Sequence, residues 1–133
     1  MARVVVVTPT YNERNNIGTL IEAIFKLGIP ELSLVVADDQ SPDGTADVAQ
    51  ALAGKYPIRV LRRTGERGYG RACVEAFRDV MNRENPDYII QMDADLSHDP
   101  AAIPALLEAI KKYDVVIGSR YVRGGAIENW ELS

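Results

Sequence analysis

Two aspartates, Asp93 and Asp95, have the type and spacing that most clearly suggest chemistry. They follow the segment 87–92, which is predicted to be a strand, and residues two apart along an extended backbone face the same way. Two neighbouring carboxylates repel each other and favour a bound proton or cation. Their oxygens suit Mg²⁺ or Mn²⁺, which would complete its shell with substrate phosphates and water. The alternative is a solvated turn into the next helix, with Ser97 or Asp99 as the N-cap.

A second acidic pair, Asp38 and Asp39, follows the apolar segment 32–37, also a predicted strand. Adjacent residues point to opposite faces, so only one of the two carboxylates can fully face a ligand. That carboxylate could accept hydrogen bonds from a nucleotide base or ribose. Alternatively, the pair could help to form the turn that Ser41-Pro42-Asp43-Gly44 predicts.

Seven arginines lie between residues 59 and 83, against three acidic residues. We expect most of this excess to form a solvated face. Arg67 and Arg71 are stronger candidates for phosphate contacts because they flank the glycines of Gly68-Tyr69-Gly70, and Arg120 follows the last predicted strand. The planar fork of an arginine matches phosphate oxygens well.

The polar segment 8–16 joins the first predicted strand to the first predicted helix. Helix N-termini bind anions, although Asn12 or Asn15 could simply cap the helix. No G-x-G-x-x-G follows the strand, which disfavours a nicotinamide or flavin site, and the absence of G-x-x-x-x-G-K-[ST] excludes a P-loop NTPase. A nucleotidyltransferase is also disfavoured, because this loop has no glycine.

Strand and helix patterns alternate along the chain. The predicted strands cover residues 3–8, 32–37, 58–62, 87–92 and 114–118. The predicted helices cover residues 17–24 (with Gly28 as C′), 45–53, 68–80 and 100–112. This order predicts an α/β, Rossmann-like fold with a mainly parallel sheet and helices on both faces. Ligands of such sheets bind at the carboxyl ends of the strands, where the acidic pairs collect.

Composition indicates a single globular domain, residues 1–133, with 47% hydrophobic and 26% charged residues and a net charge of −4. The mild acidity argues against nucleic acid as a partner.

With only Cys73 and His98, an internal disulfide and a metal site built from Cys or His are excluded. We expect Cys73 to be buried and His98 to serve the start of a helix. No apolar run approaches about 20 residues and no signal peptide precedes the first strand, so a cytoplasmic location is expected.

Five motifs in order carry a resemblance over essentially the whole chain. They are Thr8-Pro9-Thr10-Tyr11-Asn12-Glu13, Asp38-Asp39-x-Ser41-Pro42-Asp43-Gly44-Thr45, Gly68-Tyr69-Gly70, Asp93-Ala94-Asp95-Leu96-Ser97-His98 and Gly118-Ser119-Arg120-Tyr121. Together they resemble the family 2 inverting glycosyltransferases of the nucleotide-diphospho-sugar transferase (GT-A) fold. Within that family, the dolichol-phosphate (polyprenol-phosphate) mannose synthases are most similar.

The resemblance implies a role for each matching position. The base pocket would be lined by Pro9, Tyr11, Glu13, Ala37 and Asp39. Of these, Asp39 would bind the base or ribose. Asp93 and Ala94 would lie at the ribose and diphosphate, and Asp95, with Asp93, would hold Mg²⁺ or Mn²⁺. Arg120 would contact the diphosphate or the acceptor phosphate, and Asp95 and Arg120 would be the catalytic residues.

The implied reaction is metal-dependent, inverting transfer of mannose from GDP-mannose to a dolichyl or polyprenyl phosphate. The acceptor phosphate is already anionic at pH 7, so a strong general base is dispensable. The alternatives are a related transferase that uses UDP-glucose or another sugar nucleotide, and a non-catalytic fragment that binds a nucleotide sugar. Family members continue beyond the length of this chain, so we expect a fold that is incomplete at the C-terminus. The full-length protein would meet a membrane surface, on its cytoplasmic face.

Overall fold

A computed structural model describes residues 2–110, 116–118 and 127–129. In chain order its elements are β1 (Val4–Thr10), α1 (Arg14–Lys26), β2 (Leu32–Asp38), α2 (Thr45–Leu52), β3 (Ile58–Arg62), α3 (Tyr69–Arg83), β4 (Tyr88–Gln91), the 3₁₀ turn η1 (Pro100–Ala102), α4 (Ile103–Ile110), β5 (Val116–Gly118) and β6 (Ile127–Asn129). The predicted alternation of strands and helices up to α4 is therefore confirmed. Within the described residues, no helix is both long and apolar enough to cross a membrane.

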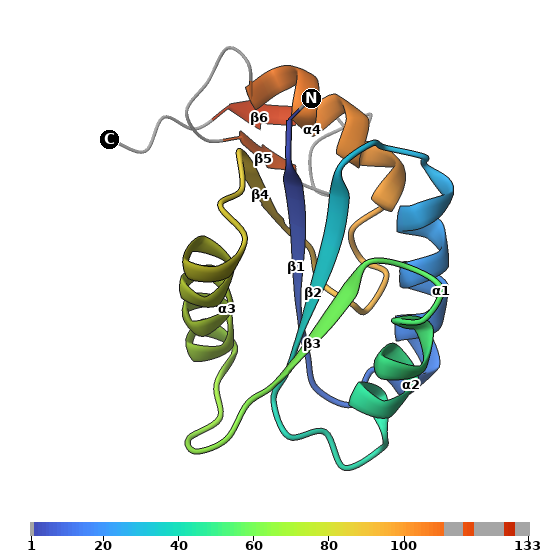
Figure 1. Cartoon of the computed structure of the whole chain (residues 1–133), viewed down its shortest axis with the longest axis vertical. Helices are drawn as coiled ribbons and strands as arrows, with labels where there is room; N and C mark the ends of the chain where they lie inside the picture. Colours follow the sequence, from blue (N-terminus) through green and yellow to red (C-terminus); the bar gives the residue numbers. More distant parts are fainter. Residues whose placement is uncertain (1, 111–115, 119–126, 130–133) are drawn as a thin grey trace.

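Four of the strands form a parallel sheet in the order β3-β2-β1-β4 (Figure 1). The chain builds from β1 outward to β2 and β3, then returns to place β4 on the opposite side of β1. The strand order thus reverses between β1 and β4. In open α/β sheets the ligand crevice lies at such a point, outside the carboxyl ends of the strands.

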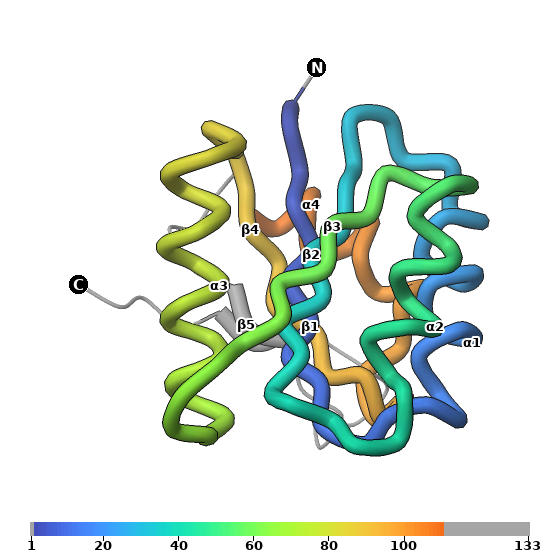
Figure 2. Tube along the Cα trace, turned by 60° about the horizontal axis from the view of Figure 1, so that its bottom comes forward, coloured from blue at the N-terminus to red at the C-terminus, as the bar shows by residue number. Residues whose placement is uncertain are grey.

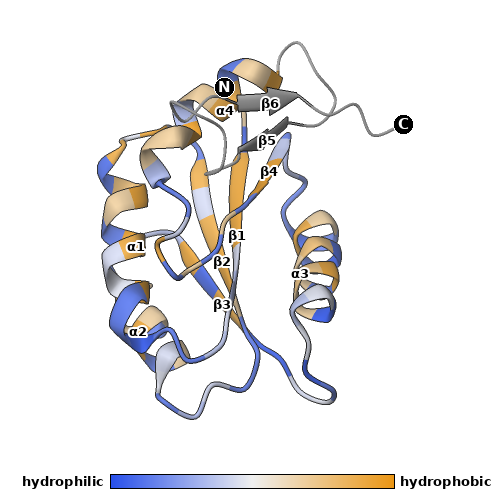
Figure 3. Ribbon diagram, turned by 180° about the vertical axis from the view of Figure 1, so that it is seen from behind, coloured by the Kyte–Doolittle hydropathy of each residue, from blue (hydrophilic) through white to orange (hydrophobic). Residues whose placement is uncertain are grey.

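Alternating residues of β1 and β2 pack against helices on opposite faces of the sheet. One core cluster joins Val4 and Val6 to the apolar stripe of α1 and to residues of α2 and α4. The other joins Val5 and Val7 to Ala76 and related residues of α3. Figures 1 and 2 show α3 alone on one side of the sheet and α1 and α2 on the other. Figure 3 shows the apolar strands between these two helical layers. The prediction of helices on both faces is confirmed.

Glycine is needed where α1 ends. The helix stops at its C-cap Leu27, and Gly28 follows with φ +64°, the left-handed conformation predicted for the C′ position. The first strand was predicted to end at residue 8, and this bound was wrong. β1 continues to Thr10, with Pro9 paired to Ala37 of β2. β4 pairs with β1 only as far as Val7, so Pro9 has a strand neighbour on one side, where a missing N–H is tolerated.

The strand predicted at residues 114–118 is confirmed at 116–118, and residues 114 and 115 lie outside the described residues, but the expectation that it joins the parallel sheet was wrong. Among the described residues, the parallel sheet has four strands, and β5 pairs antiparallel with β6, with Val116 opposite Asn129. β6 lies in the segment 121–133, whose sequence shows neither helical nor strand periodicity. The helix predicted over 100–112 begins with a 3₁₀ turn, and its α-helical part is described from Ile103 to Ile110.

Candidate active site

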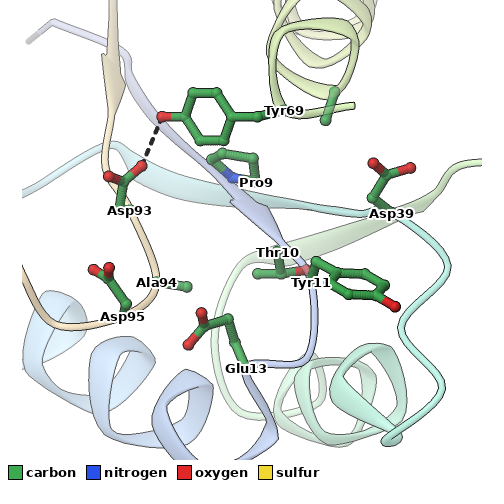
Figure 4. A pocket seen from close by; sticks show the side chains of 10 residues that line it. Pro9, Thr10, Tyr11, Glu13, Asp39, Tyr69, Asp93, Ala94 and Asp95 are labelled. Carbon is green, nitrogen blue, oxygen red and sulfur yellow. Dashed lines mark hydrogen bonds between the residues drawn. The ribbon is translucent and has the colours of Figure 1, made fainter. Parts of the chain in front are cut away.

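A cavity of about 340 Å³ lies at the point where the strand order reverses (Figure 4). It is lined by Pro9, Thr10, Tyr11, Glu13, Asp39, Tyr69, Ala72, Asp93, Ala94 and Asp95. These residues come from the carboxyl ends of β1, β2 and β4 and from the first turn of α3. In the view of Figure 4, Asp93 and Asp95 lie at the left of the cavity and Asp39 at the right. The cavity therefore has an acidic end at Asp93 and Asp95 and a second end lined by Asp39 and Tyr11.

The structure brings together seven of the nine residues that were predicted to form the site. They are Pro9, Tyr11, Glu13, Asp39, Asp93, Ala94 and Asp95. Ala37 does not share the lining, because it is fully buried in the core cluster between β2 and α3. Arg120 lies outside the described residues. Thr10, Tyr69 and Ala72 line the cavity without having been predicted.

The loop between β1 and α1 is held by the turn that follows β2. The backbone N–H groups of Asn12, Glu13 and Arg14 donate to Ser41 Oγ, Thr45 Oγ1 and Asp43 Oδ2, at 2.8, 3.0 and 3.1 Å. The expectation that Asn12 or Asn15 caps α1 was wrong, since the N-cap is Glu13 and the capping groups come from the neighbouring loop. These three N–H groups are engaged, so they do not form an open anion site.

Asp43 connects the two loops most extensively. Its carboxylate accepts from the backbone of Arg14 and from both the N–H and the hydroxyl of Thr45, while its carbonyl accepts from the Arg14 guanidinium. Gly44, the next residue, has φ +90°, and an added Cβ there would come 3.2 Å from the Arg14 guanidinium. The predicted turn over Ser41 to Gly44 is therefore a clamp that fixes how Tyr11 and Glu13 enter the cavity.

The clamp predicts a pH-dependent effect of Asp43→Asn. The Thr45 hydroxyl, together with the backbone of Arg14, holds the pKa of the Asp43 carboxyl below its usual range. A carboxyl with a lowered pKa in the folded state stabilises the fold above its unfolded pKa of about 3.9, and this contribution is lost as the pH falls through the folded pKa. We expect the variant to unfold at lower urea than the parent at pH 7, with a difference that shrinks below about pH 4. An equal effect from Asp47→Asn, on the exposed face of α2, would contradict the clamp.

The carboxylates of Asp38 and Asp39 make different contacts. This agrees with the prediction that adjacent residues point to opposite faces and that only one of the two can fully face a ligand. Asp38 accepts from the Thr10 hydroxyl and from the N–H and hydroxyl of Ser41, so it builds the turn. Asp39 lines the cavity, where its Oδ2 accepts from the backbone N–H of Gly68 at 2.8 Å and its Oδ1 from the Arg63 guanidinium. Of the two, only Asp39 lines this cavity.

Arg63 is a buried cation behind Asp39. Its side chain is 5% exposed, and it pairs with Asp39 through Nη1, with Glu75 of α3 through Nε, and with the carbonyl of Glu66 through Nη2. Burial lowers the pKa of the guanidinium, but the bond to Glu75 and the charges of Asp39 and Glu75 raise it by more. The expectation of a solvated arginine face does not hold for Arg63. The pairing follows from the strand register, in which Arg62 lies opposite Asp38, so that the next residues on each strand are neighbours.

The other arginines near the cavity have acidic or aromatic partners. Arg67 places its guanidinium carbon 4.3 Å from the centre of the Tyr11 ring, a cation–π contact at the edge of the cavity. Arg71 forms an exposed ion pair with Glu66 at 3.4 Å. The phosphate contacts expected of Arg67 and Arg71 stay predictions.

Asp93 and Asp95 reach the cavity from a turn. β4 ends at Gln91, and Ala94 and Asp95 lie in a turn, so the expectation of an extended backbone from Asp93 to Asp95 was wrong. Asp95 Oδ1 accepts from the N–H of Ser97 at 2.9 Å, and the N–H of Asp93 donates to His98 Nδ1 at 3.1 Å. His98 thus shapes the turn that carries the carboxylates. Separately, Asp99 is the predicted N-cap, accepting from the N–H of Ala101.

The donor atoms at the acidic end fit a hard divalent cation. Asp93 and Asp95 both contribute carboxylate oxygens, which suit Mg²⁺ or Mn²⁺. Among the described residues, no group of three His, Cys, Asp or Glu side chains is placed to hold a metal ion. Two carboxylates fill only part of an octahedral shell, so the remaining ligands would be phosphate oxygens and water. The chemistry of the donors therefore fits a metal that binds together with a diphosphate.

Tyr69 was not predicted as a site residue. Its hydroxyl donates to Asp93 Oδ1 at 2.7 Å and accepts from the side-chain amide of Gln91. Burial, followed by the bond to Asp93, raises the pKa of the phenol well above its ordinary value. The hydroxyl therefore stays protonated at neutral pH and remains a donor to Asp93.

Comparison with known proteins places this geometry in a family. The family model described as "Glycosyl transferase family 2" matches residues 5–133. A dolichol-phosphate mannosyltransferase from Pyrococcus furiosus is 47% identical over 130 residues, which cover 96% of this chain and 36% of that protein. An undecaprenyl-phosphate mannosyltransferase from Micrococcus luteus is 42% identical over 98% of this chain and 54% of that protein. This chain thus spans between about a third and about half of the length of these relatives.

Among solved structures, a mannosyltransferase from Pyrobaculum calidifontis in complex with GDP-Man and Mn²⁺ is similar with a TM-score of 0.75. The match has 26% sequence identity and covers 88% of this chain and 35% of that one. The match to the family model covers nearly the whole sequence, and the fold agrees with it. The chain therefore belongs to glycosyl transferase family 2 and has part of the GT-A fold.

Proposed function

We propose that this chain forms the donor-binding part of an inverting glycosyltransferase that moves mannose from GDP-mannose to a polyprenyl phosphate. The observation that carries the proposal is that Asp39 and Asp95, from the ends of two different strands, line one cavity. The names of the relatives support mannose as the sugar and a polyprenyl phosphate as the acceptor. The similar structure solved with GDP-Man and Mn²⁺ supports the donor and the metal.

The two ends of the cavity would hold the two ends of the donor. Asp39 would accept hydrogen bonds from the base or ribose beside Tyr11 and Pro9. Asp93 and Asp95 would hold Mg²⁺ or Mn²⁺ at the diphosphate. When bound, the ion would neutralise the charge that develops on the leaving nucleoside diphosphate. Arg120, placed by its family position alone, would contact the same diphosphate or the acceptor phosphate.

In this scheme the acceptor phosphate needs no general base from the protein. A phosphate monoester has a second pKa of about 6, so its oxygen is already a nucleophile at neutral pH. Attack on the anomeric carbon from the side opposite the diphosphate would give inversion. No general base is needed among the described residues, in keeping with His98 serving the turn. The acceptor would approach at a membrane surface.

A second candidate function is donor binding without transfer. This candidate is favoured by the share of the relatives that the chain matches, which is 36% of the length of one and 54% of the length of the other. In that case the chain would bind GDP-mannose through the same cavity, and transfer would need residues that only a longer chain contributes. UDP-glucose as the donor is the alternative within the family.

Binding and transfer are tested separately. The melting temperature of the chain is measured with GDP-mannose, UDP-glucose or no nucleotide, each with and without Mn²⁺. We expect the largest increase with GDP-mannose and Mn²⁺ together, and no shift with any sugar nucleotide would contradict the proposal. Transfer of labelled mannose to dolichyl phosphate is then assayed. Binding without transfer would support the second candidate function. A larger increase in melting temperature with UDP-glucose than with GDP-mannose would indicate that UDP-glucose is the donor.

A further inference from the structure

Two consecutive residues at the start of α3 contact both ends of the cavity. The backbone N–H of Gly68 donates to Asp39 Oδ2 at 2.8 Å, and the hydroxyl of Tyr69 donates to Asp93 Oδ1 at 2.7 Å. Figure 4 shows the Tyr69 side chain reaching across to Asp93 at the acidic end. The same helix is fixed to Asp39 a second time, through the bond between Glu75 and Arg63. The start of α3 thus holds one carboxylate on each side of the cavity.

The direction of the hydrogen bonds at Tyr69 follows from the acceptor. An ionised carboxylate can only accept, so the single hydroxyl hydrogen of Tyr69 must point to Asp93. Gln91 must then present its amide nitrogen, not its oxygen, to the Tyr69 oxygen. The result is a chain of hydrogen bonds from Gln91 through Tyr69 to Asp93, with the side chain of Cys73 also beside the Tyr69 hydroxyl.

We propose that Tyr69 is a positioning residue that orients Asp93 for the metal-bound diphosphate. This inference rests on the proposed function. The hydroxyl occupies Oδ1 of Asp93 and so restricts the rotation of the carboxylate, which would help Asp93 to hold the metal. It also offsets repulsion between Asp93 and Asp95, which carry like charges at one end of the same cavity. Without the hydroxyl, Asp93 loses its fixed orientation, although the aromatic ring still covers the cavity wall.

The experiment compares Tyr69→Phe with the parent chain in the binding of GDP. Calorimetric titrations are run at a series of Mn²⁺ concentrations, including none. We expect the half-saturating Mn²⁺ concentration to rise by about 10- to 100-fold, as for other residues that orient metal-binding side chains. Binding of GDP without Mn²⁺ is expected to change by less than about twofold, because Asp39 and Tyr11 are untouched.

A matched control is Tyr56→Phe. The Tyr56 hydroxyl also donates to a carboxylate, that of Glu22 on α1, but neither residue lines the cavity. This variant is expected to keep the Mn²⁺ dependence of the parent. Tyr69 is 56% exposed, so Tyr69→Phe should fold, and its melting temperature without ligand checks this.

Each outcome bears on a different claim. If the parent chain binds no GDP with or without Mn²⁺, the proposed function fails and this inference falls with it. If the parent binds with Mn²⁺ and Tyr69→Phe shows the same Mn²⁺ dependence, the proposed function stands and the role of Tyr69 is refuted. If Tyr69→Phe weakens binding equally at every Mn²⁺ concentration, Tyr69 contacts the nucleotide directly and the positioning role is again refuted.

Discussion

Replacing Asp95 by asparagine is expected to remove the Mn²⁺ dependence of nucleotide binding and to lower sugar transfer by at least about 100-fold. The substitution removes a negative charge but keeps an oxygen that can still accept from the Ser97 N–H, so the turn should survive. A bound cation contributes several kcal/mol to stabilising a leaving diphosphate, and each 1.4 kcal/mol corresponds to a factor of about ten in rate. Calorimetry with GDP and Mn²⁺ measures binding, and the transfer of labelled mannose to dolichyl phosphate measures the rate.

Asp99→Asn is the matched control for this change. Asp99 also accepts a backbone N–H two residues ahead, but it caps the 3₁₀ turn and does not line the cavity. This variant should keep both the Mn²⁺ dependence and the rate of transfer. If Asp95→Asn retains parental transfer at low Mn²⁺, the assignment of Asp95 as a metal ligand is refuted.

Much of the fold follows from local sequence signals. β1 is buried along its whole length, and its β-branched run is typical of a central strand covered on both faces. The sequence also indicates where the strands end, because acidic pairs or polar motifs lie at the carboxyl ends of β1, β2 and β4. The convergence of Asp39 and Asp95 could therefore be predicted from parallel order alone. By contrast, β5 and β6 are three residues each, and β5 pairs with a segment that carries no periodic pattern of its own.

Partners within the site could not be predicted in the same way. Which carboxylate Arg63 or Tyr69 contacts depends on strand register and on the angle at which α3 crosses the sheet. Tyr69 falls in the predicted helix 68–80, but that prediction does not say that its hydroxyl lies beside Asp93. The clamp around Asp43 is similar, because its capping groups come from 29 to 32 residues away along the chain. The residue types therefore predicted which groups could bind a ligand or a metal. Which side chains contact one another was determined by packing between segments far apart in the sequence.

Arg63→Met is expected to lower the stability of the fold by about 3–5 kcal/mol, which corresponds to a fall in melting temperature of roughly 10–15 °C. The methionine fills similar space but leaves the buried carboxylate of Asp39 without its cation. The neighbouring Arg62 is the control, because its pair with Asp47 joins side chains that are 53% and 79% exposed. Arg62→Met should cost less than about 1 kcal/mol.

Combining Arg63→Met with Asp39→Asn separates the loss of a cation from the loss of packing. If the cost of Arg63→Met comes from an unpaired buried charge, neutralising Asp39 should recover a large part of it, so the double variant should be more stable than Arg63→Met alone. Chemical denaturation of the four chains measures this coupling. Strictly additive losses would show that Arg63 stabilises the fold through packing and its bond to Glu75. Nucleotide binding should stay weak in the double variant even where stability returns, because the amide of asparagine replaces the carboxylate that would accept from the base or ribose.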